Sequence, residues 1–175
     1  MRAVIVTGKL VQDHEYIYPY YRLSESGYEI SVAVPGGEEV FGNIGTKVLT
    51  SMDTKDLRIH DFDLLVLPGG AKCMEYLRQD LQVIEFIKQF NETGKTIAAI
   101  CHAAQLLISA KIVKGRKVAG YYSLKDDIVN AGATYLDEPC VIDGNLFTTA
   151  HYKDMGPWLG KAIEANLRNA NAHVT

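Results

Sequence analysis

Short apolar runs alternate with amphipathic stretches along most of the chain, and this alternation limits the available folds more than any other feature. Four runs are too apolar for strands with one face in water and too short for helices. Each is closely bounded by Gly, Pro or Asp. We expect these runs to be buried strands, at Ala3–Val6, Ile30–Val34, Leu64–Leu67 and Thr96–Ile100.

The stretches between the runs carry apolar residues at helical spacing. In one of them, Tyr16, Tyr20 and Leu23 recur at intervals of four and three residues, and Asp80 stands at the N-cap of another. Alternating strands and helices predict right-handed crossovers and a mostly parallel sheet that is covered on both faces. We therefore predict a flavodoxin-like, three-layer α/β/α fold. The expected helices are Glu15–Glu25, Asp80 to about Gly94, His102–Ala110 and Asp154–Asn169.

Two segments differ from this pattern. Cys140–Thr149 contains Asp143-Gly144 between two β-rich runs, which is a strong hairpin signal. We interpret it, and also Gly36–Met52, as antiparallel additions to the edges of the sheet. The chain shows no repeat and no linker, so residues 1–175 are expected to form a single domain.

Composition and charge exclude several classes of protein. A net charge of −3 without a basic run argues against nucleic acid as a partner. No apolar stretch approaches the roughly 20 residues of a membrane span, and the N-terminal run is too short for a signal peptide. Three cysteines without paired spacing argue against a disulfide framework or a zinc site and favour a reducing cytoplasm.

The strongest candidate for chemistry is Cys101, which stands where a buried strand gives way to a helix. In a nucleophile elbow the residues two before and two after the nucleophile are small, and here they are Ala99 and Ala103. The positive end of a helix favours the thiolate, which is the reactive form of cysteine. The alternative is a small buried hydrophobic residue, the role that we assign to Cys73 and Cys140.

His102 follows the candidate nucleophile directly. Its backbone N–H is placed as an oxyanion-hole donor, and its imidazole can carry a proton near neutral pH or simply cap the helix. The glycines of Leu67-Pro68-Gly69-Gly70 allow a close approach of the backbone to a ligand, and Gly70 is a candidate second donor. A simple turn is the alternative for this segment.

Glu15 begins the first expected helix, and two interpretations of it stay open. An exposed carboxylate there is a favourable partner for the helix dipole. A carboxylate that points at Cys101 would instead place two acids in one site, and one of them should keep its proton. The pair would then be a nucleophile with its own proton shuttle.

Taken together, these segments resemble the ThiJ/PfpI superfamily. The matching residues run in order through nearly the whole chain: Asp13-His14-Glu15 with Tyr18-Pro19, Leu67-Pro68-Gly69-Gly70, Ala99-Ile100-Cys101-His102, Gly115-Arg116-Lys117, Ala131-Gly132-Ala133 and Asp143-Gly144-Asn145-Leu146. Within the superfamily the chain looks closest to the PfpI-like group and to plant glyoxalase III proteins. The resemblance implies a class I glutamine amidotransferase-like domain that needs no metal or organic cofactor.

The resemblance also implies roles for particular residues. Cys101 is the implied nucleophile, with His102 and Glu15 beside it and Gly70, after Gly69, near the oxyanion site. Homodimers or larger rings are implied, and in PfpI-type proteases a glutamate of a neighbouring subunit contacts the histidine. Glu75 is the nearest match to that glutamate, although one extra residue separates it from Gly70. His151 stands where several members have Arg, either in the pocket or on a surface loop.

Three functions from different classes fit these residues. The first is a cofactor-free enzyme on small reactive carbonyls, a glutathione-independent glyoxalase III or deglycase, in which the Cys101 thiolate attacks and Glu15 moves protons. The second is an amidase or peptidase in which Cys101 is acylated and His102 is the base. The third is a sensor of oxidative stress that uses selective oxidation of Cys101 without catalysis.

Overall fold

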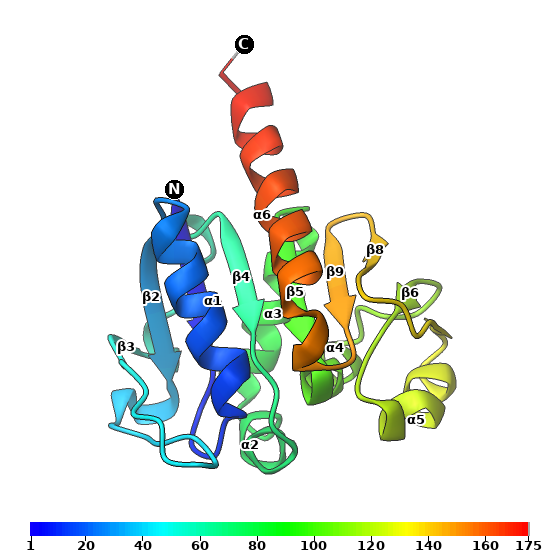
Figure 1. Cartoon of the computed structure of the whole chain (residues 1–175), viewed down its shortest axis with the longest axis horizontal. Helices are drawn as coiled ribbons and strands as arrows, with labels where there is room; N and C mark the ends of the chain where they lie inside the picture. The colour runs from blue at the N-terminus through cyan, green and yellow to red at the C-terminus, as the bar shows by residue number, and fades with distance from the viewer. Residues whose placement is uncertain (175) are drawn as a thin grey trace.

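The computed structural model describes residues 1–174 and contains a seven-stranded sheet between two layers of helices (Figure 1). The strand order is β3-β2-β1-β4-β5-β9-β8, and all neighbours are parallel except β9 and β8. This arrangement confirms the flavodoxin-like α/β/α prediction. The strands are β1 (Arg2–Val6), β2 (Glu29–Val34), β3 (Met52–Asp53), β4 (Leu64–Leu67), β5 (Thr96–Ile100), β8 (Val141–Asp143) and β9 (Leu146–Thr149).

Helices α1 and α6 pack together on one face of the sheet, whereas α3 and α4 pack on each other on the opposite face (Figure 1). Helix α2 follows β4, and α5 lies beside β6 and β7, a separate two-stranded sheet. None of the helices within residues 1–174 is both long enough and apolar enough to cross a lipid bilayer. The bounds are α1 (Asp13–Glu25), α2 (Ala71–Leu77), α3 (Leu81–Glu92), α4 (Ala104–Ser109), α5 (Lys125–Asn130), α6 (Met155–Ala172), β6 (Lys117–Val118) and β7 (Thr134–Tyr135).

The two predicted edge additions have different outcomes. Cys140–Thr149 does contain a hairpin, in which β8 runs antiparallel to β9, although β9 itself joins the sheet parallel to β5. The prediction for Gly36–Met52 is wrong. This segment is mostly a loop with one antiparallel bridge, between Phe41 and Lys47, and the short β3 that follows is parallel to β2.

The loop has a physical reason in its glycines and in a buried acid. Gly36, Gly37 and Gly45 have positive φ angles, which interrupt an extended strand. Asp13, at the start of α1, is buried and accepts hydrogen bonds from the N–H groups of Ile44 and Thr46, both at 2.9 Å. The loop is thus held against α1 by a side chain rather than by strand pairing.

Helix α6 is fixed to the sheet by polar contacts inside an apolar interface. Trp158 is fully buried, and its Nε1–H donates to the Phe147 carbonyl of β9 at 2.9 Å. Asn166, also buried, accepts from the Tyr28 hydroxyl at 2.7 Å and donates to the Asp63 carbonyl at 2.8 Å. These contacts hold the layer of α1 and α6 in register with the strands that carry the site.

Trp158→Phe should therefore lower the free energy of unfolding by about 2–4 kcal/mol, because it removes a buried hydrogen bond and leaves unfilled volume. Urea denaturation followed by circular dichroism measures the change. Leu167→Ala, at a position of α6 that is 38% exposed, is the matched control and should cost far less. Equal losses in the two variants would contradict this account of α6.

Candidate active site

Cys101 lies at the carboxyl end of β5, on a strained turn. Its φ angle is +61°, in the left-handed region that residues with a side chain rarely adopt. Ala99 and Ala103 on either side are buried, as the elbow spacing requires. The first turn, Cys101–Ala103, is a 3-10 helix, and α4 proper begins only at Ala104, later than predicted. The fold thus stores backbone strain at the residue with the candidate nucleophile.

Glu15 points into the protein and not into water, which decides between its two interpretations. The side chain is fully buried at the first turn of α1, and Oε1 accepts a hydrogen bond from the Gly69 N–H at 2.9 Å. Oε2 is also buried and has no hydrogen-bond partner of its own. The carboxyl interacts with the Cys101 thiol, which lines the same cavity.

Burial raises the pKa of Glu15 to about 8, although the Gly69 N–H and the Cys101 thiol both lower it. Burial also raises the pKa of Cys101, and the charge of Glu15 raises it further. The backbone N–H groups of His102 and Gly70 act in the opposite direction and favour the thiolate. The helix end thus favours the thiolate as expected, but burial and the neighbouring carboxylate outweigh it, so the expected thiolate is a thiol at neutral pH.

The two acids must be considered as a pair. The contribution of Glu15 to the pKa of Cys101 depends on the charge of the carboxylate, so it disappears when Glu15 holds a proton. Two acids that interact this strongly lose their protons in steps that belong to the pair. An ionised Cys101 would then have a carboxylic acid and two backbone N–H groups beside it. Near neutral pH the carboxyl and the thiol therefore both hold their protons, and the first proton to leave is lost from the pair.

His102 is half-buried next to the sulfur, with its Nδ1 at 3.3 Å from the Cys101 Sγ. Burial lowers its pKa, so the ring is neutral near neutral pH and can accept a proton. The imidazole stacks on Tyr121, with ring centroids 4.6 Å apart, and the Tyr121 N–H donates to the Cys101 carbonyl at 3.1 Å. Tyr121 thus orients both the base and the turn.

Gly69 and Gly70 are required by close packing and not only by the turn. A Cβ at Gly69 would lie 2.6 Å from Glu15 Oε1 and 2.8 Å from the Ile100 carbonyl oxygen. Gly70 has a φ angle of +105°, and a Cβ there would lie 2.7 Å from the Gln12 nitrogen. The Pro68-Gly69-Gly70 segment therefore reaches the Glu15 carboxyl and the Cys101 sulfur through its backbone.

A cavity of about 370 Å³ opens above these groups, and His151 lines it. Six rings form a continuous series, here called the aromatic wall, and four of them, His102, Tyr121, His151 and Tyr152, line the cavity. His14 stacks on Tyr152 at 4.7 Å, Tyr152 contacts His151 at 4.1 Å, and the series ends where Tyr121 stacks on His102. Tyr122 lies between the two halves, 6.4 Å from His151 and 5.5 Å from Tyr121.

Sequence reasoning identified His102 and His151 but missed the tyrosines of this wall. Tyr121 comes directly after two small residues, Ala119 and Gly120. A Cβ at Gly120 would lie only 2.8 Å from atoms of Ala104 and Ile128, so this backbone packs tightly beside the Cys101 turn. That pattern, small residues followed by an aromatic residue, was the one available signal.

Glu75 is not brought to His102 within the chain. It lies on the exposed side of α2, where its carboxylate pairs with Lys72 at 3.1 Å. A role for Glu75 across a subunit contact stays a prediction. Cys73 and Cys140 are buried free thiols that do not line the catalytic cavity. Within residues 1–174 no group of side chains is arranged to hold a metal ion.

The sequence of this chain was compared with those of known proteins and protein families. The DJ-1/PfpI family matches residues 1–165. The chain belongs to the DJ-1/PfpI family. "Deglycase PfpI" of Pyrococcus furiosus is 34% identical over 164 residues, which are 94% of this chain and 98% of that protein. "Putative cysteine protease YraA" of Bacillus subtilis is 38% identical over 154 residues, 87% of this chain and 90% of that protein.

The fold of this DJ-1/PfpI domain also recurs in solved structures. A two-domain protein of Anabaena variabilis with DJ-1/ThiJ/PfpI-like and ferritin-like domains superposes with a TM-score of 0.90 at 30% identity. The superposition covers 94% of this chain and 47% of that one. The family and the names of the two relatives together support a cysteine-dependent enzyme.

The raised pKa of Glu15 predicts how the stability of this DJ-1/PfpI protein depends on pH. Between its ordinary value of 4.5 and about 8, the folded state holds a proton that the unfolded state releases. The free energy of unfolding should fall across this range, on the order of 1.4 kcal/mol for each unit by which the pKa is raised. Glu15→Gln lacks this loss. Its free energy of unfolding should therefore rise relative to that of the native protein as the pH rises from 5 to 8.

Urea denaturation at several pH values measures this difference. Glu25→Gln removes an exposed carboxylate from the same helix and is the matched control, with little change expected. A gap between native protein and Glu15→Gln that stays constant with pH would mean that Glu15 titrates as it does in water.

Proposed function

We propose that the protein converts small reactive carbonyl compounds, with 1,2-dicarbonyls such as methylglyoxal as substrates and without glutathione. The observation that carries the proposal is the pairing of Cys101 with a buried Glu15 whose pKa is about 8. A carboxyl in that range can both take and return a proton near neutral pH. Peptide hydrolysis by a cysteine nucleophile does not need such a carboxyl. Moving a proton between two carbons needs a base that can also return the proton.

The first step forms a bond between the Cys101 sulfur and the aldehyde carbon. The thiol proton passes to the neutral His102 imidazole, 3.3 Å away, and then to the former aldehyde oxygen, which gives a hemithioacetal. The backbone N–H groups of His102 and Gly70 lie beside the sulfur and can stabilise the developing oxyanion.

The second step moves a hydrogen between adjacent carbons. The Glu15 carboxylate takes the C1 hydrogen as a proton, and the electron pair forms an enediolate. Glu15 then returns the proton to C2 while the proton of the C1 hydroxyl passes to the C2 oxygen, which leaves a thioester on Cys101. Water hydrolyses the thioester to lactate and restores the thiol, so the net reaction is methylglyoxal plus water to lactate.

Deglycation is a variant of the same chemistry, in which an amine leaves from the carbonyl adduct. The name of the Pyrococcus relative, a deglycase, supports this variant. The cavity of about 370 Å³ is large enough for more than methylglyoxal, and the His and Tyr rings that line it offer flat faces to a bound amine.

An amidase or peptidase is the second candidate function. The contact between Cys101 Sγ and His102 Nδ1 favours it, as does the name of the Bacillus relative. Within the described residues, however, His102 is oriented by stacking on Tyr121 and not by a carboxylate, and the acylation chemistry gives the buried Glu15 no task.

The decisive experiment measures lactate formed from methylglyoxal in the absence of glutathione. Native protein should form lactate, and Cys101→Ser should form none. Glu15→Gln should lower kcat by about 100-fold or more, the usual contribution of a general acid or base. Cys140→Ser, which removes a buried thiol that does not line the catalytic cavity, is the control and should keep native activity.

A native protein that forms no lactate would contradict the proposal. Release of a fluorophore from amide substrates by the same preparation, lost in Cys101→Ser, would then establish the amidase instead.

A further inference from the structure

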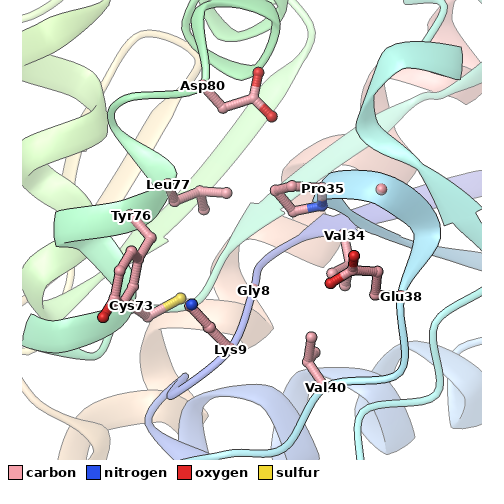
Figure 2. A pocket seen from close by; sticks show the side chains of 11 residues that line it. Gly8, Lys9, Val34, Pro35, Glu38, Val40, Cys73, Tyr76, Leu77 and Asp80 are labelled. Atoms are coloured by element: carbon pink, nitrogen blue, oxygen red, sulfur yellow. The ribbon is translucent and has the colours of Figure 1, made fainter.

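A second cavity, of about 410 Å³, lies at the carboxyl ends of β1 and β2. Figure 2 shows it around the segment that carries Gly8, with α2 on one side and the loop after β2 on the other. The segment between β1 and α1 separates it from the catalytic cavity: Gly8 and Lys9 line the second cavity, whereas Leu10 and Gln12 line the first. None of the chemistry described above uses the second cavity.

The floor of this cavity is apolar. Val34, Val40 and Leu77 are buried side chains that line it, together with Pro35. Gly8 adds no side chain, and a Cβ there would meet only ordinary contacts, the nearest at 3.7 Å from the Cys73 sulfur. The floor therefore suits a branched aliphatic group, which gains free energy when it leaves water.

One wall carries a positive charge that no acid neutralises. The Lys9 Nζ lies 4.1 Å from the centroid of the Tyr76 ring, so a cation–π contact holds the ammonium in place. Among residues 1–174, Lys9 forms no ion pair, in contrast to Lys47 and Lys72, which do. An ammonium held by an aromatic ring keeps its hydrogen-bond donors for an anionic partner.

The opposite wall carries the carboxylate of Glu38, which can pair with a cationic group of a ligand. The Glu38 side chain folds over Gly36, where a Cβ would lie 3.2 Å from its Cγ and 3.4 Å from its Oε1. In the described part of the chain, Glu38 has no ion pair or hydrogen bond. Asp80 also lines the cavity, but its oxygens already accept from the Thr54 hydroxyl and from the N–H groups at the start of α3.

The two charges stand apart across the apolar floor. In Figure 2 the Lys9 ammonium is near Cys73 and Tyr76, and the Glu38 carboxylate is on the other side of the Gly8 segment. We propose that this cavity binds the zwitterion of an aliphatic α-amino acid, with its carboxylate at Lys9, its ammonium at Glu38 and its side chain on the floor of Val34, Val40 and Leu77. A ligand of the same shape with a single charge would form an ion pair with only one of the two residues.

The test is isothermal titration of the full chain with L-leucine. Dissociation constants in the millimolar range or tighter are expected for a ligand of this size. Lys9→Met and Glu38→Gln should each weaken binding about tenfold or more, because each removes a charge-assisted hydrogen bond. Lys88→Met and Glu39→Gln are matched controls at exposed positions outside the cavity and should bind as the native protein does.

Analogues test the ligand class independently of any variant. Isopentylamine lacks the carboxylate, 4-methylpentanoate lacks the ammonium and glycine lacks the aliphatic group, and each should bind about tenfold or more weakly than leucine. Circular dichroism checks that both cavity variants are folded.

Three results would overturn the proposal. The first is no saturable binding of leucine up to roughly 10 mM, above the range expected for such a ligand. The second is unchanged binding in both Lys9→Met and Glu38→Gln. The third is loss of binding in Cys101→Ser or after alkylation of Cys101, which would assign leucine to the catalytic cavity. Because the experiment measures binding, its outcome is independent of whether methylglyoxal is converted.

Discussion

The burial of the Glu15 carboxyl is the constraint on which the rest of the site depends. A carboxyl removed from water keeps its proton to higher pH unless hydrogen bonds or opposite charges compensate. Here a single backbone N–H, from Gly69, compensates one oxygen, the other oxygen has no hydrogen-bond partner, and the carboxyl as a whole interacts with the Cys101 thiol. The result is a carboxyl that still holds its proton near neutral pH, which a glutamate in water would have released.

The parallel sheet is what brings the two acids together. Glu15 follows β1, Gly69 follows β4 and Cys101 follows β5, and these three strands are neighbours. Each contributes at its carboxyl end, where ligands gather in sheets of this kind. The segment between β1 and α1 has a second role, because it forms the wall between the two cavities and contains Leu10 at a φ angle of +64°.

Much of this could be predicted from residue patterns. The four buried strands, the Asp80 N-cap and the Cys101 turn each follow from a local rule of apolar runs, caps or small flanking residues. The direction of the Glu15 side chain could not be predicted, because an acid in the first turn of a helix suits both water and a buried partner. The ionisation of Cys101 was misjudged for a related reason: local spacing shows the helix end but not the depth of burial.

The loop over residues 36–52 and the aromatic wall could not be predicted from local sequence rules, for another reason. The loop is held by Asp13, 31 residues before its partner Ile44. The wall joins rings from four separate parts of the chain, of which only His102 is next to the nucleophile. Such contacts are set by the tertiary fold and leave little trace in the spacing of residues.

The protonation of Glu15 can be observed directly by carbon NMR of protein labelled at the glutamate carboxyl carbon. Comparison with Glu15→Gln identifies the resonance, and its shift is followed from pH 4 to pH 10. The carboxyl of Glu15 should titrate with a midpoint near pH 8. A midpoint near the ordinary value of 4.5 would contradict this expectation, because Glu15 would then be a plain carboxylate at neutral pH with no proton to share with Cys101.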